Sequence, residues 1–403
     1  MNDHKTADVF YTILRNDSPI DRNTVKEMLD NDVINSHRDF FYEDKKELIW
    51  RAGEKGLSQR NLDRLAIGLE DKEGLLTKTN KVLEHCVLNN IEVISTDSEF
   101  YPYNWTLLSG MPKVFYAKGK ISLISSVRKK GSVAVVGSRN PSGYAKYATE
   151  TMIRELAGKG IVIVSGMALG TDGYAHSACI SAGGETIGIV PGGVDYIYPP
   201  QNEHLYYSLY EKGLIISEML PGKRPIKQYF PARNRLIASL GDCVLIMEAG
   251  EHSGTLHTAA FANGQGKEVF VLPNNIYSEN AKGGLKLLKD GAVSLIDTDD
   301  VIDIVIRELI YRSEVNYISG LDGTEEKAYV SLLRNKAKNN PESLTLDEWK
   351  IIIKDLLTIR SMTADDIEKM VSLPSGKLYS LLTDMEYSGQ LRHDGAKYAL
   401  TNV

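Results

Sequence analysis

The chain has 403 residues, a formal net charge of −6, 42% hydrophobic residues and 25% charged residues. This length suggests two to four domains, and the composition is that of a folded globular protein. No apolar run is long enough to span a bilayer, and the N-terminus lacks the pattern of a secretory signal. The three scattered cysteines fit a reducing compartment and argue against a thiolate metal site. We therefore expect a cytoplasmic protein with no membrane contact.

Charge is distributed unevenly along the chain. Residues 100–149 and 219–241 contain no Asp or Glu, although both stretches are rich in Lys and Arg. The local field, rather than the net charge, decides where a polyanion docks. Both stretches also overlap glycine-rich corners, by which we mean the turns that follow predicted strands. A nucleic-acid partner is therefore compatible with the negative net charge of the chain.

The first 95 residues indicate a small helical (SAM-like) module. Apolar residues recur at spacings of three and four, as in Leu62, Leu65 and Leu69, which is typical of amphipathic helices. Residues 96–126 lead into the next domain and include a candidate short strand at 114–116. The function of the N-terminal module cannot be read from the sequence.

Residues 96–300 are predicted to form a Rossmann-like domain of the α/β class. Short Val/Ile-rich runs alternate with helical segments that begin near residues 143, 171, 202, 234, 255 and 284. Continuous apolar runs indicate strands buried on both faces, and strand–helix alternation favours a parallel sheet. The predicted strands cover residues 133–136, 161–164, 186–190, 214–216, 243–247 and 268–272.

The C-terminal part is predicted to be a linker followed by a small domain. Residues 301–344 become polar and form the predicted linker, and residues 345–403 show helices followed by a hairpin around Asp394-Gly395. Helices followed by a β-hairpin are the order of a winged helix. Its many acidic residues favour a protein-contact or structural role over reading of duplex DNA.

Small and polar residues follow the predicted strands of the Rossmann-like domain. In an open α/β sheet, ligands bind outside the carboxyl ends of the strands. Small residues allow close backbone approach, and arginine grips phosphate. The sequence therefore predicts a phosphate-bearing ligand, with a polymer favoured. The predicted contacts of these corners are Gly137, Ser138, Arg139, Ser165, Gly166, Ser253, Gly254 and Thr255.

A basic cluster follows the fourth predicted strand of this domain. Basic residues spaced two or three positions apart, with an aromatic residue among them, suit single-stranded nucleic acid. The cationic side chains hold phosphates while the aromatic ring stacks on a nucleobase. A core position for the aromatic residue is the alternative. The cluster consists of Lys227, Phe230, Arg233 and Arg235.

Four further polar residues are predicted to have structural roles. Asp172 could cap its helix or hydrogen-bond a ligand, and His176 is predicted to be a structural hydrogen-bonding residue of the same helix. Asp195 is predicted to fix its loop together with Tyr198, and Asn234 is predicted to fix a loop against the sheet.

Several enzyme classes are disfavoured. No Walker A motif occurs, and no full GxGxxG follows a strand, which argues against ATP hydrolysis and dinucleotide binding. Pro191-Gly192-Gly193 lacks the Gly-Thr that follows it in phosphoribohydrolases, and Ser253 lacks a nucleophile elbow. We expect no catalytic residue, cofactor or metal. A phosphoribohydrolase-like nucleotide-processing enzyme and a nucleotide-sensing regulator with a winged helix remain alternatives.

The corners, taken in order, resemble the bacterial DNA-processing protein A family, also called Smf. The similarity covers about residues 97–297, and a helical N-terminal module and a C-terminal winged helix also occur in that family. The matching segments are VAVVGSRNPS, VSGMALGTDGYAH, PGGVDYIYPP, SEMLPG, YFPARNRLIASL, EAGEHSGTLHTA, GKEVFVLP and GGLKLLKDGA.

This resemblance implies a homodimeric protein that binds and protects incoming single-stranded DNA and loads the RecA recombinase during natural transformation. It implies that Arg139 and Lys227 clamp phosphates, that Phe230 stacks on a base, and that the glycine and serine corners line the pocket. Five residues depart from the pattern of the family, namely Leu169, Thr171, His257, Asn274 and Asn275.

Overall fold

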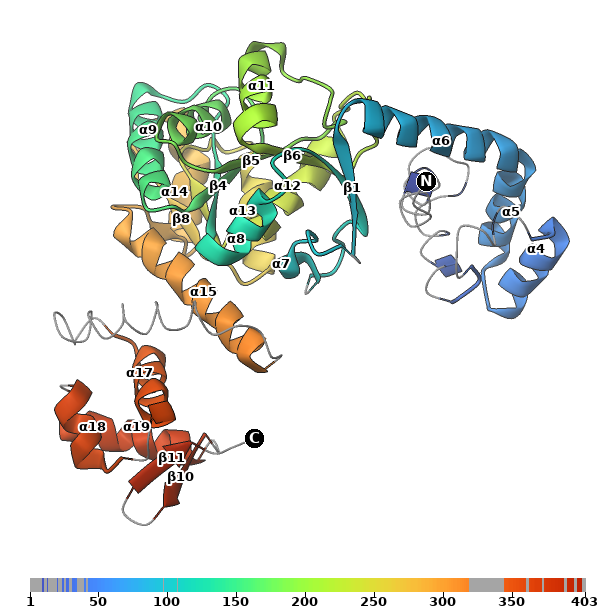
Figure 1. Cartoon of the computed structure of the whole chain (residues 1–403). Coiled ribbons are helices and arrows are strands. Elements are labelled where there is room, and N and C mark those ends of the chain that lie inside the picture. The colour runs from blue at the N-terminus through green and yellow to red at the C-terminus, as the bar shows by residue number, and fades with distance from the viewer. Residues whose placement is uncertain are drawn as a thin grey trace. The chain divides into compact units, whose positions relative to one another are not determined.

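The structure is a computed structural model of the chain (Figure 1). It describes residues 43–318 except 97 and 107, residues 344–400 except 360–361, 372, 388–389 and 395–396, and scattered positions between 9 and 40. The chain divides into two compact units, Met1–Leu309 and Ile310–Val403.

The first unit is built on a nine-stranded sheet with the order β1-β2-β6-β5-β4-β3-β7-β8-β9. Strands β3 to β9 pair in parallel, whereas β1 and β2 add an antiparallel edge through β2–β6 pairing. The predicted Rossmann-like α/β fold is thus confirmed. The strands are β1 (Ile91–Ser95), β2 (Val114–Gly119), β3 (Ser132–Val136), β4 (Val162–Ser165), β5 (Thr186–Ile189), β6 (Leu214–Ser217), β7 (Cys243–Ile246), β8 (Val269–Val271) and β9 (Val293–Ser294).

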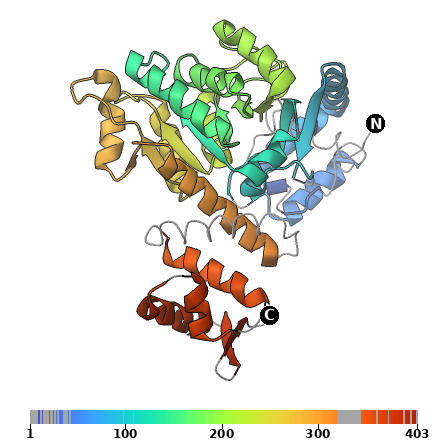
Figure 2. The same cartoon turned by 60° about the vertical axis from the view of Figure 1, so that its left-hand side comes forward.

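Helices cover both faces of this sheet (Figure 1, Figure 2). Alternate residues of β3 enter two different cores: Val133 and Val135 pack with α9, α10 and α15, and Ala134 and Val136 pack with α8, α12 and α13. Burial of both faces explains the uninterrupted Val/Ile runs. The helices are α7 (Tyr103–Thr106), α8 (Leu123–Lys130), α9 (Gly143–Gly158), α10 (Thr171–Ser181), α11 (Glu203–Lys212), α12 (Tyr229–Leu240), α13 (Thr255–Gly264), α14 (Lys282–Lys289) and α15 (Asp299–Ile318).

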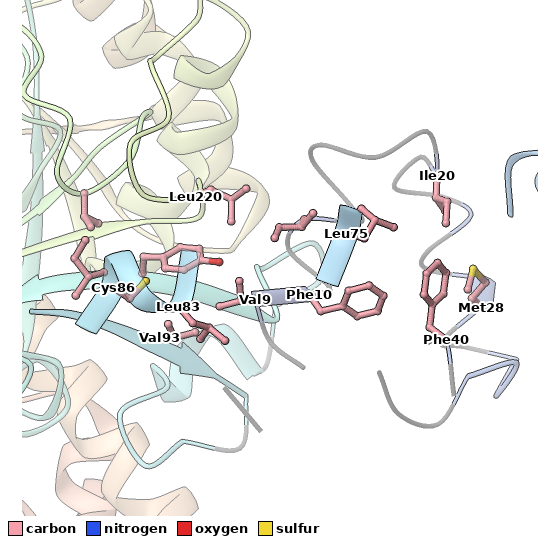
Figure 3. Close-up of a cluster of buried hydrophobic side chains, with 14 of the residues drawn as sticks. Val9, Phe10, Ile20, Met28, Phe40, Leu75, Leu83, Cys86, Val93 and Leu220 are labelled. Atoms are coloured by element: carbon pink, nitrogen blue, oxygen red, sulfur yellow. The ribbon is translucent and has the colours of Figure 1, made fainter. Parts of the chain in front are cut away.

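The N-terminal helical region contributes to a third apolar cluster of the same unit. Leu83 and Cys86 of α6 are buried with Val93 of β1 and Leu220, as the close-up in Figure 3 shows. Residues 91–95 were predicted to end the helical module, but they form an edge strand, because Ile91, Val93 and Ile94 are buried against the sheet. The helices described before β1 are α4 (Lys45–Glu54), α5 (Gln59–Gly68) and α6 (Lys72–Leu88).

In the second unit, the described residues from 344 onward form three helices and a two-stranded hairpin around an apolar core of their own. Met362 also bridges to Tyr398 of the hairpin. This is the predicted winged-helix order, although turn residue Gly395 lies outside the described residues. The elements are α17 (Leu346–Ile359), α18 (Ala364–Val371), α19 (Ser375–Tyr387), β10 (Leu391–Asp394) and β11 (Lys397–Leu400).

The predicted linker is partly helical. Residues 301–318 belong to α15, where Val301 and Val305 are buried against the sheet. The remainder of the predicted linker up to residue 343 lies outside the described residues. In the described part of the chain, no helix combines the length and apolarity that crossing a membrane requires.

Candidate nucleic-acid interface

The strand order creates a topological switch point beside β3. From β3 the chain continues to β4 and β5 on one side, and it returns to pair β7 on the other side. The loops that leave β3 and β7 therefore diverge at the carboxyl ends of the strands, where open α/β sheets bind ligands.

A pocket of about 510 Å³ lies at this switch point. It combines the corners after β3, β4 and β7 with the first turns of α12, so segments far apart in sequence converge there. Its volume falls in the range of small-molecule sites. The lining residues include Gly137, Ser138, Arg139, Ala168, Asp172, Phe230, Arg233, Asn234, Gly250, His252, Ser253, Gly254, Thr255 and His257.

Close packing fixes the positions of these corners. A Cβ at Gly137 would lie 2.5 Å from the Thr171 hydroxyl oxygen, so only glycine fits there. The Thr171 backbone N–H and hydroxyl donate to the Ser138 carbonyl at 3.1 and 3.2 Å. The Thr255 hydroxyl donates to the Gly137 carbonyl at 3.0 Å. The three strand ends are thereby joined into a preorganised cradle.

Arg139 and Phe230 form the mouth of the pocket. The guanidinium carbon of Arg139 lies 5.6 Å from the centroid of the Phe230 ring, a cation–π contact. Arg139 is exposed, and no carboxylate among the described residues forms an ion pair with it. The cationic donors of Arg139 are therefore available to an anion that reaches the pocket.

Arg233 lies on the floor of the pocket rather than at the surface. It is 6% exposed, and its Nε and Nη1 atoms have no hydrogen-bond partner among the described residues. A Cβ at Gly166 would lie 1.5 Å from Arg233 Nη1 and 2.7 Å from Asp172 Oδ2, so glycine makes room for both groups. Burial raises the pKa of Asp172 and lowers that of Arg233, while the attraction between the two charges opposes both shifts.

The structure does not bring every predicted contact to the pocket. Arg235, predicted to contact phosphate, forms a salt bridge with Glu218 and lies near Met111 instead. Ser165 was predicted to line the pocket, but it is fully buried and its hydroxyl donates to the Val135 carbonyl at 2.6 Å. Lys227 is exposed in the turn before α12, outside the pocket lining.

The four residues predicted to have structural roles all make loop or core contacts. Asp172 is not the cap of its helix, because α10 has Gly170 at its N-cap position, but its carboxylate accepts from the Ala168 N–H at 3.2 Å. The Asn234 amide donates to the Gly254 carbonyl at 3.2 Å. Asp195 accepts from the Gly222 N–H at 2.6 Å. A second Asp195 oxygen lies 2.6 Å from Nε2 of His85, a contact that joins α6 to the loop after β5.

His176 is a buried neutral residue. Its Nδ1 lies 2.7 Å from the Thr186 hydroxyl, whose single proton is donated to the Ile163 carbonyl at 2.9 Å. Nδ1 must therefore carry the proton and donate to Thr186. Burial lowers the pKa of His176 to about 3, with the Arg233 charge acting in the same direction.

The loop after β5 is covered by another segment of the chain. A Cβ at Gly192 would lie 2.8 Å from the Lys223 carbonyl oxygen and 2.9 Å from Pro225 Cδ. The Gly193 N–H donates to the Lys223 carbonyl at 2.8 Å. These glycines therefore serve close packing within the chain, which weighs against the phosphoribohydrolase alternative.

Sequence reasoning missed several residues of the site. His252 lines the pocket, and its position directly before Ser253 at a strand-end corner was an available signal. Tyr198 lies beside Phe230, with ring centroids 6.0 Å apart, although the two are 32 positions apart in sequence. Among the departures from the family pattern, His257 lines the pocket and Asn274 donates to buried Glu248 at 3.1 Å.

Comparison with known proteins agrees with this architecture. A sequence model described as DNA recombination-mediator protein A matches residues 92–305, which are 214 of the 403 residues. The DNA processing protein DprA of Bacillus subtilis is 37% identical over 57% of this chain and 77% of its own length. Protein Smf of Escherichia coli is 32% identical over 63% of this chain and 68% of its own length.

A solved structure of a DNA-processing protein is also similar to this chain. The X-ray structure of DprA from Streptococcus pneumoniae has a TM-score of 0.52 and 28% identity, and the match covers 69% of this chain and 96% of that one. Residues 92–305, which the sequence model matches, include every corner of the pocket. The chain therefore belongs to the DNA recombination-mediator protein A family.

Proposed function

We propose that this protein binds single-stranded DNA in the cytoplasm, protects it, and loads the RecA recombinase onto it during natural transformation or recombination. The observation that carries the proposal is the exposed Arg139 over Phe230, with no ion-pair partner among the described residues, at the mouth of a pocket on the topological switch point. Membership of a DNA recombination-mediator family supports the same role.

The geometry favours a single strand over a duplex. An exposed cation beside an aromatic ring suits a flexible strand, because the cation holds the phosphate while an unstacked base packs on the ring. Gly254, the N-cap residue of α13, adds a backbone N–H group that suits an anion at a helix N-terminus, whereas the Thr255 N–H already donates to the Ser253 hydroxyl at 3.2 Å. Duplex bases are already stacked and offer only phosphates to such a site.

The basic and aromatic residues at and near the pocket differ in their roles in this proposal. Arg139 and Lys227 hold phosphates, and Phe230 packs on a base. Arg233 offers its unpartnered guanidinium nitrogens to a phosphate that reaches the pocket floor. Arg235 has no role as a contact, because Glu218 already neutralises it. The protein acts as a binder, with no bond made or broken.

Fluorescence anisotropy with a labelled oligothymidylate and a matched duplex tests this function. Arg139→Ala is expected to weaken single-strand binding roughly tenfold, the loss of one charge-assisted phosphate contact. Lys227→Ala should weaken it less, because a single flexible ammonium is a point charge.

Lys212→Ala is the matched control for these variants. Lys212 is also an exposed basic residue. It is the last residue of α11, just before β6, and so lies at the amino ends of the parallel strands, opposite the carboxyl ends that form the pocket. Equal binding by wild type and Arg139→Ala would contradict the proposal. Binding of a nucleoside monophosphate with no binding of the oligonucleotide would favour the nucleotide-sensing alternative.

Recombinase loading and homodimer formation are further parts of the proposal. On single-stranded DNA coated with a single-strand-binding protein, the wild type should shorten the lag in RecA ATPase activity, and Arg139→Ala should not. Sedimentation equilibrium of the full chain should give twice the 44.7 kDa chain mass. An unchanged lag would refute loading, and a monomer mass would refute the dimer.

A further inference from the structure

A second, smaller recess adjoins the main pocket on the side of Tyr198. Its volume is about 60 Å³, and it shares Arg139, Ala168, Phe230 and Arg233 with the main pocket. Phe230 and Arg139 therefore line both recesses. The residues that belong only to the second recess are Gly166, Leu169, Pro191, Tyr198 and Pro199.

The walls of this recess are held in place by buried groups. The Asn202 amide donates to the Met167 and Ala168 carbonyls at 2.9 Å each, which ties the loop after β4 to the segment that follows Tyr198. The buried Tyr206 hydroxyl donates to the Tyr198 carbonyl at 2.9 Å. Met167 also has a φ of 60°, a left-handed conformation that is unfavourable for a non-glycine residue. The recess is therefore preorganised.

Tyr198 presents the more accessible aromatic ring of the pair. It is 42% exposed, whereas Phe230 is only partly exposed and contacts both Arg139 and Tyr198. A recess of 60 Å³ is too small to enclose a nucleobase, so a base would lie against the exposed ring at its rim. Tyrosine is suited to this contact, since it offers a large apolar face with little loss of conformational entropy.

Charge favours a phosphodiester strand on this side of Phe230. Pro191 of the recess begins the loop whose Gly193 N–H donates to the Lys223 carbonyl, which brings the acid-free segment 219–241 alongside. Arg224 and Lys227 in that segment are exposed. The buried Nη1 and Nε of Arg233, without hydrogen-bond partners among the described residues, lie at the floor that the two recesses share.

We propose that the Tyr198 recess is a second nucleotide subsite, in which Tyr198 stacks on the base adjacent to the one that Phe230 holds. This inference rests on the proposed function. The DNA strand then runs from the Ser253–Thr255 corner, past Arg139 and Phe230, to Tyr198. Beyond Tyr198 it meets the basic side chains near residue 224. Arg233 donates to the phosphate that joins the two bound nucleotides.

Tryptophan fluorescence of Tyr198→Trp tests the stacking directly. Thymine stacked on the introduced indole should quench its emission as oligothymidylate is added, beyond the change seen in wild type with its three native tryptophans. Tyr207→Trp is the matched control, because Tyr207 is also exposed but lies on α11 and lines neither recess. Absence of extra quenching in Tyr198→Trp at saturating DNA would overturn the proposal.

Affinity measurements separate this inference from the proposed function. Tyr198→Ala should lose roughly tenfold in affinity for oligothymidylate, as expected for one stacked base, and Tyr198→Phe should keep it. If Arg139→Ala loses affinity while Tyr198→Ala binds as tightly as wild type, the subsite is refuted and the single-strand function stands. If neither variant differs from wild type, the proposed function itself fails.

Discussion

Replacement of Gly166 by alanine is the sharpest structural test of the pocket floor. The added Cβ would lie 1.5 Å from Arg233 Nη1 and 2.7 Å from Asp172 Oδ2, although Cβ contacts under 3.0 Å essentially never occur. Arg233 is 6% exposed, so its guanidinium must leave a packed position. Overpacking of this kind costs about 1–3 kcal/mol. We expect Gly166→Ala to lower the free energy of unfolding by that amount.

Gly254→Ala is the matched control for this substitution. Gly254 lines the same pocket, has a φ of −59°, and would place its Cβ in open space. Its unfolding free energy should therefore remain within about 0.5 kcal/mol of wild type. Urea denaturation of the full chain, followed by circular dichroism, measures both variants.

A double-mutant cycle then tests whether Arg233 is the cause. Removing the guanidinium in Arg233→Ala should make Gly166→Ala less costly, with a coupling of roughly 1 kcal/mol or more between the two positions. A Gly166→Ala variant as stable as wild type would refute the packed floor. A clear destabilisation without coupling would mean that some group other than Arg233 is displaced.

Three further predictions concern acid, base and helix capping. His176 has a pKa near 3 in the folded protein, against an ordinary value of 6.5. It therefore stays neutral on acidification while the same residue of the unfolded chain takes up a proton. The free energy of unfolding should fall by about 2 kcal/mol as the pH is lowered from 7 to 5. His176→Gln should remove this part of the acid sensitivity, and an identical profile would refute it. Burial lowers the pKa of Lys267 to about 8 in the folded protein. Above pH 8 the unfolded chain therefore binds more protons at this residue than the folded protein does. The free energy of unfolding should rise by about 1 kcal/mol from pH 8 to pH 9. Lys267→Met should abolish this rise in urea titrations. The same variant leaves the carbonyls of Ala238, Ser239 and Gly241 at the end of α12 without their donor, so it should be less stable than wild type at pH 7 by about 1–3 kcal/mol.

The parallel sheet was predictable because its strands are buried on both faces. Their Val/Ile runs place the predicted strands within one or two residues of β3 to β8. The corners at residues 137–139 and 253–255 were predictable for a related reason, since ligands bind where parallel strands end. Convergence of the corners on one pocket follows from the strand order, which the sequence pattern does not contain.

The error at Arg235 has a simple geometric origin. The prediction placed the start of this helix near residue 234 and took Arg233 and Arg235 together as phosphate contacts because of their spacing in the sequence. The helix α12 instead begins at Tyr229, with Pro231 tolerated in its first turn. Residues two apart on a helix point in nearly opposite directions, so Arg233 reaches the pocket and Arg235 reaches Glu218.

Tyr198 was predicted only to fix its loop, and its place beside the pocket could not be predicted from the sequence for a different reason. Its contact with Phe230 joins the loop after β5 to the first turn of α12, and no local pattern encodes this long-range pairing. The edge strand β1 was missed because only three of its five residues are buried. A half-buried short strand gives a weaker signal than the central strands do.

The salt dependence of single-strand affinity tests the central claim most directly. Each phosphate that a cation neutralises adds about 0.7 to the magnitude of the slope of log affinity against log salt concentration for single strands. Anisotropy titrations with oligothymidylate across a salt series give this slope for wild type, Arg139→Ala and the control Lys212→Ala. The account predicts a steep slope for wild type, a slope shallower by about 0.7 for Arg139→Ala, and no change for Lys212→Ala. An affinity independent of salt, or the same slope in wild type and Arg139→Ala, would contradict phosphate binding at Arg139.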